Sequence, residues 1–363
     1  MIDPSSPEAG PGLVKAPRSL PVLSVTRKIR YGSCPRMDYF HSIVRRVLRK
    51  KDENLRFGSL FHKGLEAWWR ARMDVPTDPD GWILSAIDAV RSDTDSDPFD
   101  RIKAEILMHG YHTVWSGDDI EVLGVEVPFE GDLRNPLTSG VSRTFRLGGK
   151  IDAIVRAPSG QVWLVEHKTS SEDISDGSIY WQRLTLDSQV STYMTGARML
   201  GYEPAGCIYD VIGKPSMRPL KATPIESRKY TKPTAKNPVS RLYAGQREFD
   251  ETPEEYGERL VKHLAGEPEE DAEEGAEPKN KNQPRYDQYF RRAPIVRLQD
   301  EQREAEYNMW GVALQIRESM ATGIWPRNEK SCEQYRRLCD YFPVCTKQTG
   351  IDDDSKYRDK EKT

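Results

Sequence analysis

The sequence predicts an α/β protein in which a central mixed β-sheet is flanked by helices. Three observations lead to this fold class. Residues 148–168 read as two strands joined by a Pro-Ser-Gly turn. The second of these strands contains an unbroken Val-Trp-Leu-Val run, which is typical of a strand covered on both faces. Residues 57–73 carry an apolar stripe at helical spacing, so the chain also supplies helices that can cover the sheet.

The chain ahead of the hairpin is predicted to be mainly helical. Helices are predicted at 37–51, 57–73, 82–91 and 99–115, after an extended lead-in at 22–34. The helix at 37–51 is amphipathic with a basic end. The helix at 57–73 places His62 and Glu66, which are four residues apart, on one face. Trp68 and Trp69 belong to its apolar stripe and are expected in the core, while Glu66 is expected to pair with nearby basic side chains.

Strands and helices alternate in the rest of the chain. Strands are predicted at 120–129, 143–156, 161–168, 205–213 and 285–298, and helices at 179–200, 253–265 and 300–320. Gln189 and Tyr193 are four residues apart and share a face of the helix at 179–200. Glu126 lies in the strand at 120–129, and this strand context alone makes it a candidate accessory carboxylate.

Polar segments interrupt and flank this pattern. The predicted segments are a flexible tail at 1–21, a basic insertion at 215–249, a disordered acidic stretch at 266–284 and a charged tail at 346–363. The net charge of −3 therefore averages over charges that are segregated along the chain. Basic residues cluster at 45–51 and at 218–236, and these two clusters fit a solvated face and a nucleic-acid-binding face about equally well. No run of 18 apolar residues and no apolar signal-peptide core occur, so no membrane contact and a cytoplasmic location are expected.

An acidic residue stands beside an apolar run in each strand of the central hairpin. Asp152 follows Ile151, Glu166 follows the Val-Trp-Leu-Val run, and Lys168 shares a strand face with Glu166. Carboxylates at the edge of a buried sheet are unfavourable unless a cation uses them, and Mg²⁺ or Mn²⁺ prefers such oxygen ligands. A cation held there would lower the pKa of a water and stabilise charge on a phosphate, with the lysine orienting the water. The hairpin therefore predicts metal-dependent phosphodiester hydrolysis.

Four stretches of this chain together resemble the PD-(D/E)XK nuclease superfamily, and specifically its RecB-like branch. They occur in the family's order and are GSLFH ending at His62, GKID ending at Asp152, EHK at 166–168, and QVSTY at 189–193. Glu-x-Lys alone is a weak signal, whereas the added His and Gln-x-x-x-Tyr mark the RecB-like branch. The resemblance covers residues 22–345, which it identifies as a nuclease domain, and it implies a restriction-endonuclease-like core.

The resemblance also implies a role for each matching residue. The implied ligands of one or two Mg²⁺ or Mn²⁺ ions are His62, Asp152, Glu166 and the backbone carbonyl of His167. Asp152, Glu166 and Lys168 would be the catalytic residues, with Lys168 positioning or activating the attacking water. Gln189 and Tyr193 would line the site and contact the DNA strand. The side chain of His167 is expected to be a spectator, because it points away from Glu166 and Lys168.

Cysteines near the two ends of the domain fit a second feature of this branch. In RecB-like nucleases of the AddB and CRISPR-associated types, one cysteine before the nuclease core and three after it hold a [4Fe–4S] cluster. The resemblance implies the same role for Cys34, Cys332, Cys339 and Cys345, joining the N-terminal segment to the cysteine region at 331–345. The C-x6-C-x5-C spacing departs from the family's shorter first gap, and a structural zinc ion is the alternative. Cys207, within an apolar strand, is expected to be a buried small residue.

RecB-like relatives commonly act on DNA ends, so we expect a metal-dependent DNA exonuclease that accepts single-stranded DNA. The alternatives are a structure- or sequence-specific endonuclease on the same fold and a non-cleaving DNA-binding subunit of a recombination or repair complex. The basic segments can track a phosphate backbone. Several aromatic residues lie among basic ones and fit base stacking and packing of the insertion equally well. They are Tyr230, Tyr286, Tyr289 and Phe290.

A partner protein is also expected. The chain contains no G-x-x-x-x-G-K-[ST] motif, so a helicase or recombination partner would be a separate chain. Compact nucleases of this type are similar to stand-alone proteins of phage and prokaryotic recombination or defence systems. That expectation is an analogy at the level of the family.

Overall fold

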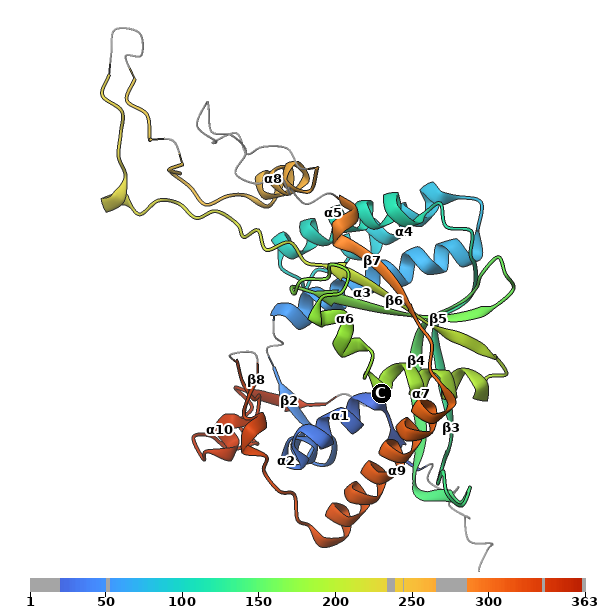
Figure 1. Ribbon diagram of the computed structural model, residues 1–363. Helices are drawn as coiled ribbons and strands as arrows, with labels where there is room; N and C mark the ends of the chain where they lie inside the picture. Colours follow the sequence, from blue (N-terminus) through green and yellow to red (C-terminus); the bar gives the residue numbers. More distant parts are fainter. Residues whose placement is uncertain are drawn as a thin grey trace, which may run out of the picture.

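A six-stranded mixed sheet with helices on both faces forms the core of the protein (Figure 1). This arrangement confirms the predicted α/β class. The computed structural model describes residues 20–49, 53–233, 239–243, 245–265, 286–334 and 337–360. The acidic stretch predicted at 266–284 and residues 1–19 of the predicted N-terminal tail lie outside the described residues.

The sheet has the strand order β1-β4-β5-β6-β7, and β3 pairs with the other edge of β4. Its strands are β1 Val22–Leu23, β3 Glu121–Arg134, β4 Val141–Arg156, β5 Val162–Ser170, β6 Pro204–Gly213 and β7 Phe290–Ile295. β5 and β6 are parallel, whereas β4 is antiparallel to both β3 and β5. Gly160 adopts φ 84° in the turn between β4 and β5, a left-handed conformation that glycine accepts without a steric penalty.

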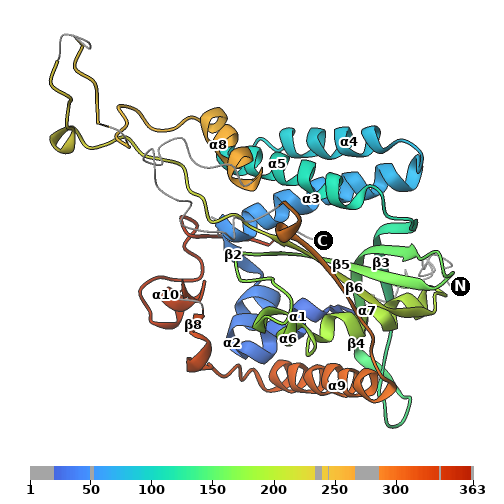
Figure 2. The same cartoon turned by 45° about the horizontal axis from the view of Figure 1, so that its top comes forward.

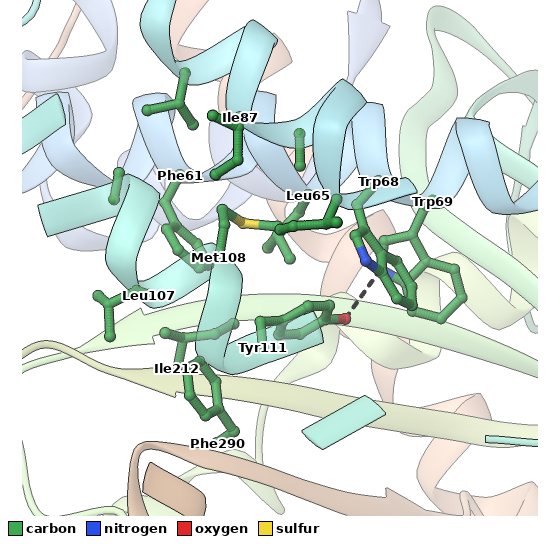
Figure 3. Packing of buried hydrophobic residues seen from close by; sticks show 14 of the residues in the cluster. Phe61, Leu65, Trp68, Trp69, Ile87, Leu107, Met108, Tyr111, Ile212 and Phe290 are labelled. Atoms are coloured by element: carbon green, nitrogen blue, oxygen red, sulfur yellow. Dashed lines mark hydrogen bonds between the residues drawn. The ribbon is translucent and has the colours of Figure 1, made fainter. Parts of the chain in front are cut away.

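Helices from the first half of the chain cover one face of the sheet. They are α3 Glu53–Asp74, α4 Pro79–Arg91 and α5 Pro98–Trp115, joined by α8 Pro253–Ala265 from later in the sequence. Trp68 and Trp69 of α3 are buried between these helices and the sheet, as predicted, and Figure 3 shows how closely they approach Tyr111 of α5. Glu66 bonds Arg70 one turn later, at 3.0 Å.

An Asp-Pro pair starts two of these helices. Asp78 accepts a hydrogen bond from the backbone N–H of Gly81 at 3.1 Å, and Asp97 accepts one from that of Phe99 at 2.9 Å. The proline that follows each aspartate occupies a first-turn position, where no backbone donor is needed. These caps explain why α4 and α5 begin three residues and one residue before the predicted helices.

A second set of helices covers the opposite face (Figures 1 and 2). It comprises α1 Val25–Ser33, α6 Ile179–Leu184, α7 Ser188–Met199 and α9 Gln299–Thr322. The prediction of a single helix at 179–200 is therefore wrong, because the helical structure is interrupted between Leu184 and Ser188. Asp187 caps α7 by accepting a hydrogen bond from the backbone N–H of Gln189 at 2.9 Å.

Two predictions for the N-terminal region are also wrong. Residues 22–34 are not an extended lead-in, since α1 follows the short β1 and is capped by the Ser24 hydroxyl. The helix predicted at 37–51 is replaced by three short pieces: α2 Pro35–Asp38, the short π-helix Tyr39–Ile43 and β2 Arg46–Leu48. Arg45 separates the last two with φ 64°. The strand forms because its partner comes from the far end of the chain.

That partner is β10 Tyr357–Asp359, which pairs antiparallel with β2. The segment predicted as a charged tail therefore returns to the N-terminal region. Before it lie β8 Glu333–Gln334, β9 Arg337–Leu338 and α10 Phe342–Cys345, with short 3-10 turns at Tyr286–Tyr289 and Glu329–Ser331. Tyr341 donates a hydrogen bond to the backbone carbonyl of Arg46 at 2.7 Å, which ties this C-terminal part to β2.

The basic insertion leaves the end of β6 and runs away from the sheet before it returns to α8 (Figure 1). In its described part it contains a single 3-10 turn, Ile225–Ser227, and one isolated bridge between Tyr230 and Leu242. Backbone hydrogen bonds join its two limbs, from Thr223 to Arg247 at 2.9 Å and from Thr231 to Arg241 at 2.8 Å. The irregular structure that the composition predicts is present in these residues.

Candidate active site

The candidate site lies where β4 separates from β5. β4 and β5 pair only from Ala153↔Val165 to Arg156↔Val162. Nearer the start of β4, Arg146 and Leu147 pair instead with β1. Asp152 is the residue of β4 immediately before the part that pairs with β5. Its Oδ2 accepts a hydrogen bond from the backbone N–H of His167 at 2.9 Å. The Asp152 side chain thus takes the place of the next backbone hydrogen bond between β4 and β5. This contact fixes the Asp152 carboxylate beside β5.

Glu166 stands on β5 next to this fork and is buried, with 4% of its surface exposed. One oxygen, Oε1, accepts a hydrogen bond from Lys168 Nζ at 2.9 Å. The other, Oε2, is buried and has no hydrogen-bond partner among the described residues. Burial, followed by the nearby Asp152 carboxylate, raises the pKa of Glu166 to about 8. A divalent cation at this position would relieve both effects.

Lys168 shares the strand face of Glu166, as predicted, and contacts three oxygen-bearing side chains. Its Nζ lies 2.9 Å from Glu166, 2.7 Å from Gln189 Oε1 and 3.6 Å from Asp187 Oδ2. Burial alone would lower the pKa of Lys168, but the carboxylates of Glu166 and Asp187 raise it above its usual value. The ammonium is therefore charged and held in one place.

Helix α7 supplies Gln189 and Tyr193, the two residues predicted to contact the DNA strand. Gln189 donates from Nε2 to the hydroxyl of Tyr193 at 2.9 Å, so the predicted shared face of these two residues is confirmed. Tyr193 packs edge-on against Phe129 of β3, with ring centroids 6.0 Å apart. Burial raises the pKa of Tyr193, so its phenol stays neutral and can donate a hydrogen bond. Gln189 thus links Lys168 to Tyr193 in one chain of contacts.

His62 reaches the site from α3, on the other side of the sheet. Its ring lies edge-on to that of His167, with centroids 6.1 Å apart. Burial lowers the pKa of His62, although the Asp152 carboxylate acts in the opposite direction. A neutral imidazole is the form that binds metals. The side chain of His167 does point away from Glu166 and Lys168, and it lies 3.1 Å from Asp210 Oδ2.

Glu126 lies on β3 at the position opposite Asp152, between the pairs Val125↔Ala153 and Val127↔Ile151. It adopts φ 53°, an unfavourable conformation for a residue with a side chain. Its carboxylate pairs with Lys150. Its role as an accessory carboxylate stays a prediction.

The donor set suits a hard divalent cation. Asp152 and Glu166 offer carboxylate oxygens, and His62 offers a neutral nitrogen. Among the described residues, no three or more His, Cys, Asp or Glu side chains converge tightly enough to hold a metal ion. The carboxylates instead contact Lys168 and the amide of His167, which a cation would compete with. The buried, partnerless oxygen of Glu166 is the observation that fits the ion.

The cysteines predicted to act together come from both ends of the chain. Cys34 is buried, while Cys332, Cys339 and Cys345 are partly buried, and none forms a disulfide. Cys34 Sγ accepts a hydrogen bond from the backbone N–H of Asn328 at 3.4 Å, and Cys339 N donates to Cys332 O at 2.8 Å. Burial raises the pKa of Cys339 and Cys345, and the nearby Cys34 thiol adds to the rise in both. Cys207 is fully buried, as predicted.

The aromatic residues predicted near the basic segments divide between core and surface. Phe290 is buried in the core of the α3–α5 side, and Tyr289 is half-buried beside His263. Tyr230 is 51% exposed on the insertion. The side chain of Tyr286 lies outside the described residues.

Three site residues were missed by the sequence reasoning. Asp187 contacts Lys168 and accepts a hydrogen bond from the Tyr209 hydroxyl at 3.0 Å. Lys28 of α1 donates to the Ser188 hydroxyl at 2.7 Å. The signal for Asp187 was present, because Asp187-Ser188 is a favourable helix start inside the predicted helix. Lys28 and Tyr209 carry no comparable local signal.

Comparisons with known proteins identify a family for this chain. A family model described as the PD-(D/E)XK nuclease superfamily matches residues 22–346. No curated protein matches the chain. Among solved structures, the chain is similar to SSO0001, known from a crystal structure, with 16% sequence identity and a TM-score of 0.20. That match covers 42% of this chain and 61% of SSO0001, which is less than two thirds of the latter's length.

None of the helices in the described residues has the length and apolar character needed to cross a bilayer.

The family match extends over most of the chain and includes the hairpin that carries Asp152, Glu166 and Lys168. Members of the matched family are nucleases that typically use Mg²⁺ or Mn²⁺. The chain therefore belongs to the PD-(D/E)XK nuclease superfamily.

Proposed function

We propose that this protein is a metal-dependent DNA nuclease of the RecB-like branch, most simply a DNA exonuclease that accepts single-stranded DNA. The observation that carries the proposal is the buried Oε2 of Glu166, which has no partner among the described residues and stands beside Asp152 and Lys168. A carboxylate held this way is unfavourable in a protein that only binds DNA. It is useful in one that brings a cation to a phosphate.

The cation would be Mg²⁺ or Mn²⁺, held by His62, Asp152, Glu166 and the backbone carbonyl of His167. When bound, it would supply a water of lowered pKa and neutralise charge on the phosphate. Lys168 orients the attacking water or the phosphate oxygen, because Glu166 and Gln189 fix the position of its ammonium. Tyr193, as a neutral phenol, donates a hydrogen bond to the DNA backbone from α7.

DNA ends are the proposed substrate. The basic insertion stands away from the sheet, and its exposed Tyr230 lies among residues that include Arg228 and Lys229. Such a surface suits an unpaired strand, since lysine and arginine neutralise phosphates and an aromatic ring stacks on a base. A separate helicase or recombination protein would supply such strands. The nuclease would work in the cytoplasm of a prokaryotic cell or a phage-infected host.

A second cofactor is proposed at the cysteines. Cys34, Cys332, Cys339 and Cys345 would hold a [4Fe–4S] cluster, with a structural zinc ion as the alternative. The free thiols and the effect of the nearby Cys34 thiol on the pKa values of Cys339 and Cys345 support this assignment. The group would join the two ends of the chain and take no part in hydrolysis.

The proposal is tested by cleavage of end-labelled DNA in Mg²⁺ or Mn²⁺, using linear and circular substrates in single- and double-stranded form. We expect linear single-stranded DNA to be degraded and circles to survive, because a circle offers no end. Lys168→Ala should lower the rate at least about a hundredfold, since it removes the group that orients the water. Lys103→Ala is the matched control, because Lys103 is also partly buried but packs on Tyr256 of α8.

Each other outcome selects a different function. Cutting of circular DNA would identify an endonuclease on the same fold. A Lys168→Ala protein that cuts at the parental rate would refute the catalytic assignment. A parental protein that binds DNA but cuts none of the four substrates would identify a non-cleaving subunit.

A further inference from the structure

Directly behind the candidate site, a row of ionisable side chains crosses three strands. His167 of β5 pairs in register with Asp210 of β6, and Asp210 pairs with Arg292 of β7. Side chains alternate between faces along a strand, so this row faces the α3–α5 layer while Glu166 and Lys168 face α7. On β5, His167 lies between Glu166 and Lys168, so the two groups of side chains start from neighbouring residues and face opposite sides of the sheet. The proposed hydrolysis makes no direct use of Asp210 or Arg292.

Asp210 is fully buried, and one of its oxygens, Oδ2, receives every contact of the row. It lies 3.1 Å from His167 Nδ1, 3.2 Å from Arg292 Nη2 and 2.5 Å from the hydroxyl of Tyr111. Arg292 also donates to the Tyr111 hydroxyl at 2.9 Å and pairs with Asp118. An apolar set of similar volume would serve packing alone at least as well, so a buried charge row of this kind calls for a further reason.

The aromatic groups around Asp210 hold the row rigidly. Trp69 donates from Nε1 to the Tyr111 hydroxyl at 3.0 Å, the contact drawn in Figure 3. The guanidinium of Arg292 lies over the ring of Trp115, 4.2 Å from its centroid. Asp210 is therefore an anchor, held by Arg292 and Tyr111, on the side of the sheet away from the site.

His167 connects this anchor to the groups that would bind the cation. Its backbone N–H holds Asp152 Oδ2 at 2.9 Å. Its ring lies between Asp210 and two residues of α3, with centroids 6.1 Å from His62 and 5.6 Å from Trp69. A change in the orientation of residue 167 would therefore move both Asp152 and His62.

We propose that Asp210 is a positioning residue for the cation site, acting through the His167 side chain to hold Asp152 and His62 in place, with Arg292 and Tyr111 fixing Asp210. This inference rests on the proposed function for its link to cleavage. The proposal gives the His167 side chain a positioning role in place of the predicted spectator role. Groups that orient metal ligands from behind typically change metal affinity or activity about 10–100-fold when they are removed.

The test compares Asp210→Asn with Asp38→Asn. Asp38 is also fully buried and also paired with arginine, 3.2 Å from Arg27 Nε, but it lies in α2, remote in sequence from the hairpin. Mn²⁺ affinity is measured by calorimetry, the melting temperature by circular dichroism, and kcat and KM with labelled DNA. Asp210→Asn should weaken Mn²⁺ binding and lower kcat about 10–100-fold, with KM for DNA unchanged. Asp38→Asn should lower the melting temperature and leave Mn²⁺ affinity and kcat parental.

A second pair of variants keeps the test decisive if Asp210→Asn does not fold. His167→Asn retains a polar group near the position of Nδ1, which lies 3.1 Å from Asp210 Oδ2, whereas His167→Val removes it. His167→Asn should keep most of the Mn²⁺ affinity, and His167→Val should lose it. Equal affinities in these two variants, or equal losses in Asp210→Asn and Asp38→Asn, would overturn the proposal. Normal Mn²⁺ binding by a parental protein that cuts no DNA would instead refute only the nuclease function, because the affinity measurement needs no cleavage.

Discussion

The Glu166 carboxyl is the group on which the proposed chemistry of this protein depends most. It is buried beside Asp152, and only one of its oxygens has a partner among the described residues. Its pKa is raised from the usual 4.5 to about 8, first by burial and then by the Asp152 charge. The metal-free folded protein therefore keeps this proton near neutral pH, where the unfolded chain has released it.

This shift predicts how pH affects stability and metal binding. A carboxyl that binds its proton more tightly in the folded state makes the free energy of unfolding fall as pH rises from about 4.5 to 8. Mn²⁺ must displace the proton, so Mn²⁺ affinity should rise over the upper part of the same range and level off above about pH 8. Thermal melts in EDTA and calorimetry with Mn²⁺ at a series of pH values measure the two effects.

Glu166→Gln is the matching control, because the amide has nearly the same size and does not titrate. It should remove the fall in stability and most of the Mn²⁺ binding. A parental protein whose metal-free stability is flat between pH 4.5 and 8 would show that Glu166 is not protonated as described.

At the scale of elements, the position of α7 against β3 sets the place of Gln189 and Tyr193. Gly196 allows the close approach, since a Cβ there would lie 2.5 Å from Cγ of Phe129. Gly196→Ala should therefore lower the free energy of unfolding by about 1–3 kcal/mol. Because Phe129 also packs on Tyr193, cleavage should fall as well. Urea denaturation and the DNA assay measure these changes.

Gly311 of α9 provides the control. A Cβ at this helical position meets nothing within 4 Å. Gly311→Ala should raise the free energy of unfolding by about 0.4–1 kcal/mol, because alanine loses less backbone entropy in a helix. If both alanine variants shift stability in the same direction, the close packing of α7 on β3 does not control this part of the fold.

Elements with local signals could be predicted from the sequence, whereas those made by distant contacts could not. Helices α3, α4 and α5 and the β4–β5 hairpin follow from periodicity, caps and a turn glycine. Strand β2 could not be predicted, because it exists through pairing with β10 near the other end of the chain. In the site, Asp152, Glu166 and Lys168 were found from the strand pattern, and the roles of the other motif residues came from the family resemblance. Tyr209 was missed because only the sheet register places it beside Glu166, where its hydroxyl donates to Asp187.

At the scale of the whole molecule, contacts between the two ends of the chain hold the parts around the site together. β2 pairs with β10, and Asn328 donates both to Cys34 Sγ and to the carbonyl of Ser33. The cysteines from both ends are proposed to act together in this region, although no three of them converge tightly enough to hold a metal ion among the described residues. A cluster there would close a loop that contains nearly the whole domain, and such closures restrict the unfolded chain strongly.

Anaerobic purification tests the cluster. We expect a brown protein with about four iron atoms per chain and a broad visible absorption that bleaches on reduction. Cys339→Ser should lose iron and melt at a lower temperature, while Cys207→Ser, which changes a buried cysteine outside the group, should keep its iron. A colourless protein with one zinc ion would identify the alternative, and the absence of both metals would exclude a metal-binding role for these cysteines.

The central claim is that Asp152 and Glu166 hold a divalent cation next to Lys168. Crystals soaked in Mn²⁺ and measured near the manganese absorption edge test it most directly. We expect an anomalous peak from an ion bound by oxygens of both carboxylates, with Oε2 of Glu166 among its ligands. Well-ordered Asp152 and Glu166 side chains with no peak between them, at saturating Mn²⁺, would contradict it.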